Sequence, residues 1–347
     1  MLRQEILEFM YRMEPAKLEL DPSRVIVTVG SNQLLHLVAE TLFDPGDIVL
    51  TGSPTYFVFL GTLANLGVRT VGIASDEFGI KPESLRETLR LLEARGEASL
   101  VRSLYVVPYF DNPASTTIPL DRRIEIAQIV EQWREKYENF TLLADYAYQE
   151  LGFEGEEFVP PWRSIDASTD EYVLELGTFS KSFSPGNRVG WGVFPAAIAE
   201  KISDMKANID FGSPNFNQQL MAVVLESGSI LPHIELIQQT YRKKCHAMLH
   251  ALDLHFSEFD QVRWLRPKGG LYVWMELPEG VSTGPGTPFY ESALEQGVLY
   301  VPGEYCFPAE GASVQYNTMR LTFGVQTPSR IAEGIELLAK SLRKVLT

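Results

Sequence analysis

Cysteine is scarce in this sequence of 347 residues, which contains only Cys245 and Cys306. Two cysteines without a CxxC pair exclude the disulfide framework of a small secreted domain and give no thiol pair for a zinc site. The first residues, MLRQEILEFMYRMEP, have the pattern of an amphipathic helix and lack the continuous apolar run of a signal peptide. No apolar run is long enough to span a bilayer. We therefore expect a soluble, cytoplasmic protein without a membrane partner.

Positive charge is also in short supply. Lys and Arg number 30 against 45 Asp and Glu, which gives a formal net charge of −15. This sign opposes binding to nucleic acid, because cationic contacts to phosphate dominate that binding. A local cluster of basic residues is still compatible with this negative net charge. The hydrophobic share of 45% is ordinary for a globular chain with a real core.

Short apolar runs alternate with helical patterns from about residue 25 to residue 195. The strand candidates are VIVTV, DIVLTG, TVGIA, SLYVVP, TLLADY, YVLELG and VGWGVFP. They are rich in Val, Leu and Ile and mostly lack polar alternation, as expected for parallel strands buried on both faces. Helical patterns such as NQLLHLVAETLF and DRRIEIAQIVEQWREKY lie between them. This alternation predicts a doubly wound α/β layer.

The pattern changes after about residue 230. A long helix is predicted over HIELIQQTYRKKCHAMLHALDLHF, a hairpin over VRWLRPKGGLYVWMEL and a short strand over TMRLTFG. The last segment predicts a helix with Thr327 as its N-cap and Pro328 in its first turn. We expect a large domain over 21–234, and a smaller α+β domain formed by 1–20 and 235–347.

Polar and aromatic side chains follow the ends of several predicted strands. They are Ser31, Asn32, Tyr56, Asn112, Asp145 and Tyr148. Ligands of open α/β sheets bind at the carboxyl ends of the strands, so these residues are candidates for one site. Ser31 and Asn32 open a helix, and the free N–H groups of a helix start attract anions. Taken singly, each residue also fits an ordinary turn or plain packing.

The segment TFSKSFSPGNR, from Thr178 to Arg188, places a lysine among hydroxyl side chains between two predicted buried strands. A lysine amine forms a Schiff base with an aldehyde cofactor. Hydroxyls and an arginine, here Thr178, Ser180 and Arg188, suit a phosphate group. A buried carboxylate such as Asp145 is costly unless it meets a cation, and a protonated pyridine nitrogen is such a cation. These residue types therefore favour a phosphorylated pyridine aldehyde as ligand.

Five segments together carry a resemblance to a known family. They are TFSKSFSPGNRVGW, ADYAY, PYFDNPASTTI, GSN and NTMRLTF. The chain resembles the pyridoxal-phosphate-dependent aminotransferases of fold type I, class I/II, in its lysine motif, Asp-x-x-Tyr, Asn-Pro segment, phosphate loop and C-terminal arginine strand. The matches occur in the family's order across nearly the whole chain. The resemblance implies an α/β fold with a mostly parallel, doubly wound sheet in the large domain and a smaller α+β domain.

The resemblance also implies a role for each residue around the cofactor ring. Lys181 is expected to be the Schiff-base lysine and the proton shuttle. Asp145 is expected to pair with the pyridine nitrogen. Tyr148 and Asn112 are expected to hydrogen-bond the phenolic oxygen of the ring, and Tyr56 to stack on its face.

The same resemblance implies two anion sites. The residues expected to hold the cofactor phosphate are Ser31, Asn32, Thr178, Ser180 and Arg188. Arg320 is expected to bind the α-carboxylate of the substrate, together with Asn112. Asn32 stands where similar sequences tend to carry Gln, which is a conservative departure.

The implied reaction moves an amino group between an L-amino acid and a 2-oxo acid by a ping-pong mechanism through a Lys181 aldimine, in a homodimer. The resemblance slightly favours aromatic amino acids, 2-aminoadipate or branched amino acids as the amino donor, with 2-oxoglutarate as the acceptor. Two alternatives stay open: a lyase on the same scaffold, and a regulatory module that senses the cofactor, although no basic DNA-binding head is present. The family usually has several dozen residues before the helix LRQEILEFMYRM, so a shortened, weakly active cofactor-binding form is a further hypothesis.

A metal site is a weaker hypothesis. His246 and His250 are four residues apart on a predicted helix, with Cys245 adjacent and His255 beyond. This spacing puts two imidazoles on one helix face, as in some zinc sites. Because no acidic third ligand follows at a known spacing, we expect a packed or solvated helix face and no metal.

Overall fold

A computed structural model describes residues 1–13, 20–155 and 158–347. The larger sheet has nine strands in the order β1-β8-β7-β6-β5-β2-β3-β12, with β4 paired to β3. Their bounds are β1 Val25–Thr28, β2 Ile48–Ser53, β3 Arg69–Asp76, β4 Gly79–Ile80, β5 Val101–Val106, β6 Thr141–Asp145, β7 Val173–Thr178, β8 Gly190–Val193 and β12 Glu310–Gly311. The neighbours from β7 through β12 run parallel, whereas β8 is antiparallel to both β1 and β7. All seven predicted strands of this region are present, in a mostly parallel sheet with helices, as expected.

Helices connect these strands in chain order. Their bounds are α1 Leu2–Met13, α2 Ser31–Leu42, α3 Phe57–Asn65, α4 Pro82–Ala94, α5 Leu120–Arg134, α6 Phe179–Ser182, α7 Ala196–Asp210, α8 Asn215–Glu226 and α9 Ile230–Phe256. Short 3₁₀ turns are η1 Pro22–Arg24, η2 Ala98–Leu100, η3 Gln149–Leu151, η4 Trp162–Ser164, η5 Ala167–Glu171, η6 Pro185–Asn187 and η7 Gly303–Cys306. None of the described helices is by itself long and apolar enough to cross a membrane; α8 and α9 pass that test only as a pair bent by 91°.

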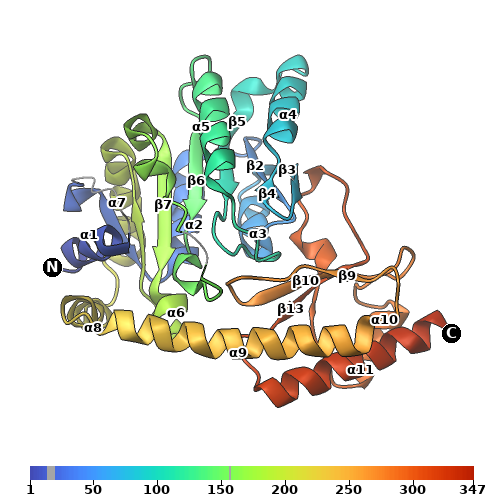
Figure 1. Ribbon diagram of the computed structural model, residues 1–347. Coiled ribbons are helices and arrows are strands. Elements are labelled where there is room, and N and C mark those ends of the chain that lie inside the picture. Colours follow the sequence, from blue (N-terminus) through green and yellow to red (C-terminus); the bar gives the residue numbers. More distant parts are fainter. Residues whose placement is uncertain (14–19, 156–157) are drawn as a thin grey trace.

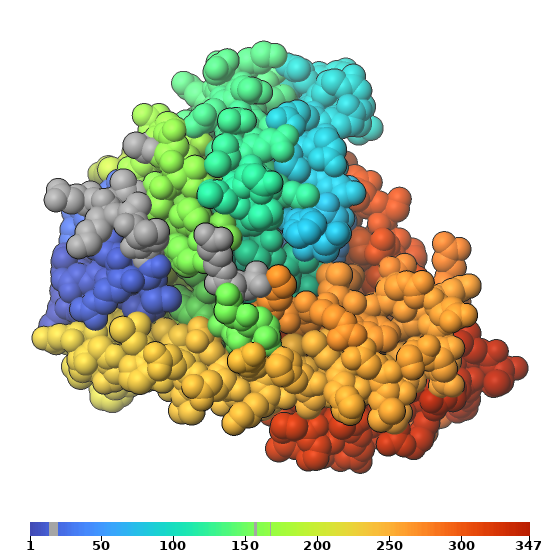
Figure 2. All heavy atoms as spheres, in the orientation of Figure 1, coloured from blue at the N-terminus to red at the C-terminus, as the bar shows by residue number. Residues whose placement is uncertain are grey.

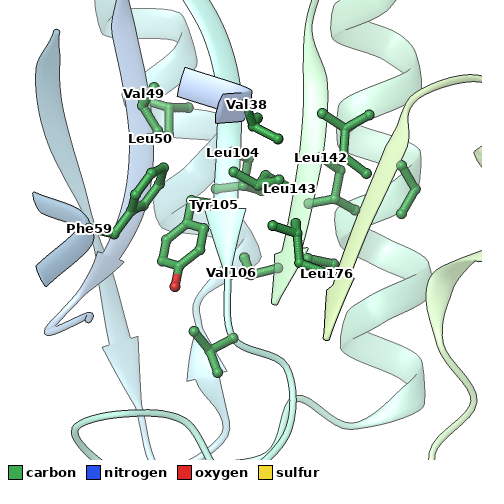
Figure 3. Packing of buried hydrophobic residues seen from close by; sticks show 14 of the residues in the cluster. Val38, Val49, Leu50, Phe59, Leu104, Tyr105, Val106, Leu142, Leu143 and Leu176 are labelled. Carbon is green, nitrogen blue, oxygen red and sulfur yellow. The ribbon is translucent and has the colours of Figure 1, made fainter. Parts of the chain in front are cut away.

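The core of the large sheet is aliphatic. Leu50, Leu104, Leu142, Leu143 and Leu176 have no exposed surface, and Figure 3 shows them side by side on adjacent strands. Burying one such side chain stabilises the fold by roughly 1.5–3 kcal/mol. This explains why the strand sequences lack polar alternation, since helices cover both faces of the sheet.

The second sheet is antiparallel and lies beyond the carboxyl ends of the parallel strands. Its order is β11-β13-β10-β9, with β9 Arg263–Trp264, β10 Tyr272–Glu276, β11 Val301–Pro302 and β13 Thr318–Thr322. In Figure 1 the arrowheads of β6 and β7 point toward the side where β10 and β13 lie. The predicted hairpin and strand are therefore present. The sheet packs with α9, α10 (Pro288–Glu295) and α11 (Pro328–Leu346) in a second hydrophobic cluster.

The C-terminal helices frame this smaller sheet. The side chain of Thr327 accepts the backbone N–H of Arg330, so α11 begins with the predicted cap. The long helix α9 packs along α11. Figure 2 shows α9 in yellow across the lower side of the molecule, reaching from the α8 end to the α11 end.

The expected division into two domains stays a prediction. Two packing contacts in the structure join segments that this division separates. The first helix was grouped with residues 235–347, but its buried face, including Ile6 and Phe9, packs with β1, β8 and α8. The reason is its apolar stripe, which packs with Val25 and Val27 of β1 in one hydrophobic cluster. At the opposite edge, β12 from the C-terminal part pairs with β3 of the large sheet. The rest of the first segment, 14–19, lies outside the described residues.

Candidate active site

All eleven residues singled out from the sequence line one cavity of about 260 Å³ at the carboxyl ends of the parallel strands. They are Ser31, Asn32, Tyr56, Asn112, Asp145, Tyr148, Thr178, Ser180, Lys181, Arg188 and Arg320. They come from nine different segments between α2 and β13, because parallel strands deliver their carboxyl ends to one edge. The same cavity is lined by Phe57, Val58, Val107, Ala147 and Tyr272, which the sequence did not single out.

Lys181 lies on the short helix α6, directly after β7. Its Nζ is 5.7 Å from the ring centroid of Tyr148. Within the described residues, this amino group has no hydrogen-bond or ion-pair partner. A lysine amine that faces a cavity without such a partner is available to react with a carbonyl group.

Asp145 is the last residue of β6 and is buried. Burial raises the pKa of its carboxyl group to about 6, against the lowering effects of the Ala147 N–H, the Tyr105 hydroxyl and the charge of Lys181. The Tyr105 hydroxyl donates to Oδ2 at 3.2 Å and the Ala147 N–H to Oδ1 at 3.1 Å. A cation beside this carboxyl would favour its charged form and relieve the cost of burial.

The anion side of the cavity is built at the start of α2. Gly30 precedes the helix with φ +84°, and a Cβ on it would lie 2.3 Å from Nη2 of Arg188. The glycine therefore lets the guanidinium approach the helix start. Arg188 donates to Ser180 Oγ at 3.0 Å and to the Val29 carbonyl at 3.2 Å.

The hydroxyls of α6 complete this anion side. The side chain of Thr178 caps α6 by accepting the Ser180 N–H at 3.2 Å, and its hydroxyl donates to Ser180 Oγ at 3.0 Å. Together with the free N–H groups at the start of α2, these hydroxyls and Arg188 form a set of donors suited to a phosphate.

Tyr56 and Asn32 contact each other across the cavity. The Tyr56 hydroxyl donates to Asn32 Oδ1 at 3.1 Å. Burial is the main reason that the pKa of Tyr56 is raised, so its hydroxyl stays protonated. The Asn32 side chain therefore accepts a hydrogen bond from Tyr56, and it lies at the predicted anion side of the cavity.

Asn112 connects the two ends of the cavity. Its Nδ2 donates to the Tyr148 hydroxyl at 3.4 Å, and its Oδ1 accepts from Arg320 Nη1 at 2.7 Å. The Asn112–Pro113 peptide bond is cis. The Tyr148 hydroxyl is also 3.2 Å from that of Tyr272, and burial raises the pKa of Tyr148 well above its ordinary value.

Tyr272 is the main residue that the sequence missed. The guanidinium carbon of Arg320 lies 4.3 Å from the Tyr272 ring centroid and 5.5 Å from that of Phe57. The guanidinium thus lies over both rings, and Nε of Arg320 is buried with no hydrogen-bond partner among the described residues. The strand pattern LYVWMEL gave the position of Tyr272, but only the pairing of β10 with β13 brings it to Arg320.

The residues considered for a metal site, His246 and Cys245, lie on α9 and do not line the cavity. His246 Nε2 lies 2.7 Å from Glu154 Oε1, and Cys245 is buried. Among the residues that the structure describes, no group of three or more His, Cys, Asp or Glu side chains could hold a metal ion.

The comparisons with known proteins agree with this geometry. Residues 1–338 match the family model of aminotransferase class I and II, and the chain belongs to this family. It is 34% identical to aromatic-amino-acid aminotransferase 1 of Thermococcus litoralis over 92% of this chain and 72% of that protein. It is also 34% identical to the 2-aminoadipate transaminase of Thermus thermophilus, over 94% of this chain and 77% of that protein.

A solved structure is similar over the whole chain. Pyrococcus horikoshii kynurenine aminotransferase, solved in complex with PMP, superposes with a TM-score of 0.88 at 32% identity, and the match covers 100% of this chain and 80% of that one. The protein is thus a pyridoxal-phosphate-dependent aminotransferase of fold type I, as the sequence predicted.

The residues present fit pyridoxal phosphate. Asp145 is a buried carboxyl that lacks a hydrogen-bonded cation among the described residues, which suits a protonated pyridine nitrogen. Lys181 supplies an amine for the aldehyde, and the donors around Arg188 suit the phosphate. The unpartnered Nε of Arg320 suits a substrate carboxylate at the other end of the cavity.

Proposed function

We propose that the protein transfers amino groups between an aromatic amino acid or 2-aminoadipate and a 2-oxo acid such as 2-oxoglutarate. The observation that carries the site assignment is the single cavity lined by all eleven predicted residues. The names of the relatives support the substrate class, since they act on aromatic amino acids, 2-aminoadipate and kynurenine.

In this proposal the residues at the start of α2 and on α6 would hold the phosphate of the cofactor. The N–H groups at Ser31 and Asn32 and the hydroxyls of Thr178 and Ser180 would donate to it. Arg188 would add a charge-assisted hydrogen bond, and its contact with Ser180 supports that role.

Tyr56 and Asp145 would hold the ring of the cofactor, and Asp145 would keep the pyridine nitrogen protonated by ion pairing with it. Tyr148 and Asn112, which hydrogen-bond each other, would bind the phenolic oxygen. When bound, pyridoxal phosphate supplies a ring that accepts the electrons left after the Cα proton of the substrate is removed.

Lys181 has two tasks in this scheme. Its amine would hold the aldehyde of the cofactor between turnovers and, once free, would carry the Cα proton of the substrate on Nζ. Its position above the Tyr148 ring, away from other described polar partners, supports this mobility. The amine works as a general acid and base over a short path.

Arg320 recognises the α-carboxylate. Nη1 already donates to Asn112, and the rings of Tyr272 and Phe57 hold the guanidinium plane. The remaining N–H groups, including the buried Nε, offer two parallel hydrogen bonds to a carboxylate. This contact selects amino acids and 2-oxo acids over simple amines.

We further propose a homodimer in the cytoplasm. Several large apolar side chains are exposed at one end of the molecule and support a second copy as partner; they are Ile209, Phe211, Phe216, Leu220 and Val223. The two cysteines are free thiols, which supports a reducing compartment. Nucleic acid and membranes are not proposed as partners.

The test is an absorbance titration of the full chain with pyridoxal phosphate, followed by single amino acids. We expect a visible band on binding, and its loss with an aromatic amino acid or 2-aminoadipate together with release of the matching 2-oxo acid. The Lys181→Ala variant is expected to give no such band. A band that persists in Lys181→Ala contradicts the lysine assignment, and a response to other amino acids alone contradicts the substrate class.

A further inference from the structure

Tyr272 makes two contacts at the cavity, and they use different parts of its side chain. Its ring lies against the guanidinium of Arg320, with 4.3 Å from Cζ to the ring centroid. Its hydroxyl oxygen lies 3.2 Å from that of Tyr148. The ring contact belongs to the end of the cavity proposed for the substrate carboxylate, whereas the hydroxyl contact belongs to the proposed cofactor site. A carboxylate held by Arg320 needs only the ring, so the hydroxyl has a separate role.

The surrounding structure holds Tyr272 in this place. The residue is 8% exposed, and it pairs with Thr322 across β10 and β13. Ser115 Oγ donates to its backbone carbonyl at 2.9 Å, which ties β10 to the loop that carries Asn112. The rings of Tyr148 and Tyr272 meet edge to face, with centroids 5.9 Å apart. Packing and a backbone hydrogen bond therefore keep the hydroxyl beside Tyr148 before any ligand binds.

The directions of the hydrogen bonds around Tyr148 follow from the types of the groups. A guanidinium only donates, so Asn112 presents Oδ1 to Arg320 and its NH₂ group to Tyr148. The Tyr148 oxygen therefore accepts from Asn112. Burial, together with the neighbouring Tyr272, raises the pKa of Tyr148 well above its ordinary value, so Tyr148 keeps a proton to donate. That proton can point to Tyr272 or into the cavity.

An acceptor in the cavity decides between these two directions. The Tyr272 hydroxyl has Tyr148 as its only hydrogen-bond partner among the described residues. When an oxygen atom in the cavity accepts the Tyr148 proton, the Tyr272 hydroxyl donates to the Tyr148 oxygen instead. The two donations strengthen each other, because a hydroxyl that accepts a hydrogen bond becomes a better donor. The pair thus forms a chain of two donors that ends at a ligand oxygen.

We propose that Tyr272 is a positioning residue for the phenolic oxygen of the cofactor: its hydroxyl donates to Tyr148 and so turns the Tyr148 proton toward that oxygen. This inference rests on the proposed cofactor site. A hydrogen bond donated to the phenolic oxygen favours the charged, deprotonated form of that oxygen. Through Tyr148, the Tyr272 hydroxyl therefore lowers the pH at which the bound cofactor loses the proton that this oxygen holds or shares.

The first test separates the hydroxyl of Tyr272 from its ring. Tyr272→Phe keeps the ring against Arg320 and removes only the hydroxyl. The visible band of the full chain loaded with pyridoxal phosphate is recorded as a function of pH. We expect the midpoint of its pH transition to rise by roughly half to one pH unit in Tyr272→Phe. Tyr316→Phe, at a position that is 56% exposed, is the matched control and should leave the midpoint unchanged.

The second test compares two ligands by fluorescence titration of the cofactor-free protein. We expect Tyr272→Phe to weaken binding of pyridoxal phosphate by roughly 3- to 10-fold, because the donor to the phenolic oxygen becomes weaker. Binding of 3-deoxypyridoxal phosphate, which lacks that oxygen, should stay nearly unchanged. The KM of the amino acid substrate should also change little, since the ring against Arg320 remains.

The third test asks whether Tyr272 acts through Tyr148. Tyr148→Phe keeps the pair of rings and removes the hydroxyl that links Tyr272 to the ligand. In this background, adding Tyr272→Phe is expected to cause no further rise of the midpoint, because the chain of donors is already broken. Such non-additivity is the sign of two residues that act as one unit.

Each outcome separates the inference from the proposed function. An unmodified chain that fails to bind pyridoxal phosphate refutes the cofactor site, and the inference falls with it. Normal binding with an unchanged or lowered midpoint in Tyr272→Phe refutes the proposed direction of the hydrogen bond. Equal weakening for both ligands indicates a merely structural effect and refutes the positioning role. An equal rise of the midpoint in the Tyr148→Phe background refutes the path through Tyr148.

Discussion

Asp145→Asn is expected to stabilise the cofactor-free protein while it disables the site. Burial raises the pKa of Asp145 from 3.8 to about 6. A carboxyl with a raised pKa in the folded state costs stability wherever it is charged, so the cost grows between pH 4 and 6 and is complete above about pH 6. The shift of about two pH units corresponds to roughly 3 kcal/mol.

The amide variant keeps most of the local contacts. Its oxygen can accept the Ala147 N–H, and its NH₂ group faces the Tyr105 hydroxyl, which can turn to accept. The variant therefore removes the charge with little loss of packing. We expect the free energy of unfolding without cofactor to rise by up to about 3 kcal/mol at pH 8, with little difference at pH 4.

Urea denaturation of the cofactor-free protein between pH 4 and 8 measures this difference, with Asp204→Asn as the exposed control. The cofactor should reverse the order, because only the carboxylate of the unmodified chain pairs with a protonated pyridine nitrogen. Equal stability of the two proteins at pH 8, or a difference that does not change with pH, would refute the reasoning about Asp145.

Three further predictions concern single side chains. Arg320→Lys keeps the charge but loses the forked contact, so kcat/KM should fall by roughly 10- to 150-fold. Gly190→Ala puts a Cβ at 2.5 Å from the backbone of Gly30 and Ser31, so affinity for pyridoxal phosphate should fall by more than about tenfold. Burial raises the pKa of Glu150 to about 7 and its Oε2 has no hydrogen-bond partner among the described residues, so Glu150→Gln should raise the free energy of unfolding by up to about 3 kcal/mol above pH 7.

Each of these has its own check. Steady-state kinetics test Arg320→Lys. A loss confined to kcat, with an unchanged KM, would contradict a role in binding the carboxylate. Absorbance titration tests Gly190→Ala against Gly61→Ala, where nothing lies within 4 Å of the added carbon. Denaturation at pH 5 and 8 tests Glu150→Gln, and a gain that is larger at pH 5 has the wrong sign.

Local pattern was sufficient for most secondary structure. The apolar runs became strands because they are buried on both faces, and Leu104 and Leu142 are fully buried as that pattern requires. The pattern did not predict β12, whose Glu310 pairs with Val71 of β3, 239 positions earlier in the chain. Such a pairing depends on where the small sheet docks, which no local propensity encodes.

The sequence by itself determined the chemistry of the site. Polar residues placed directly after buried strands converge, because parallel strands end at the same edge, and so Asp145, Lys181 and Arg188 line one cavity. Tertiary structure alone decided which ordinary residues join them. Tyr272 faces Arg320 because β10 pairs with β13. Tyr272 is unusual in neither type nor local pattern, so only the packing of distant elements gives it a part in the site.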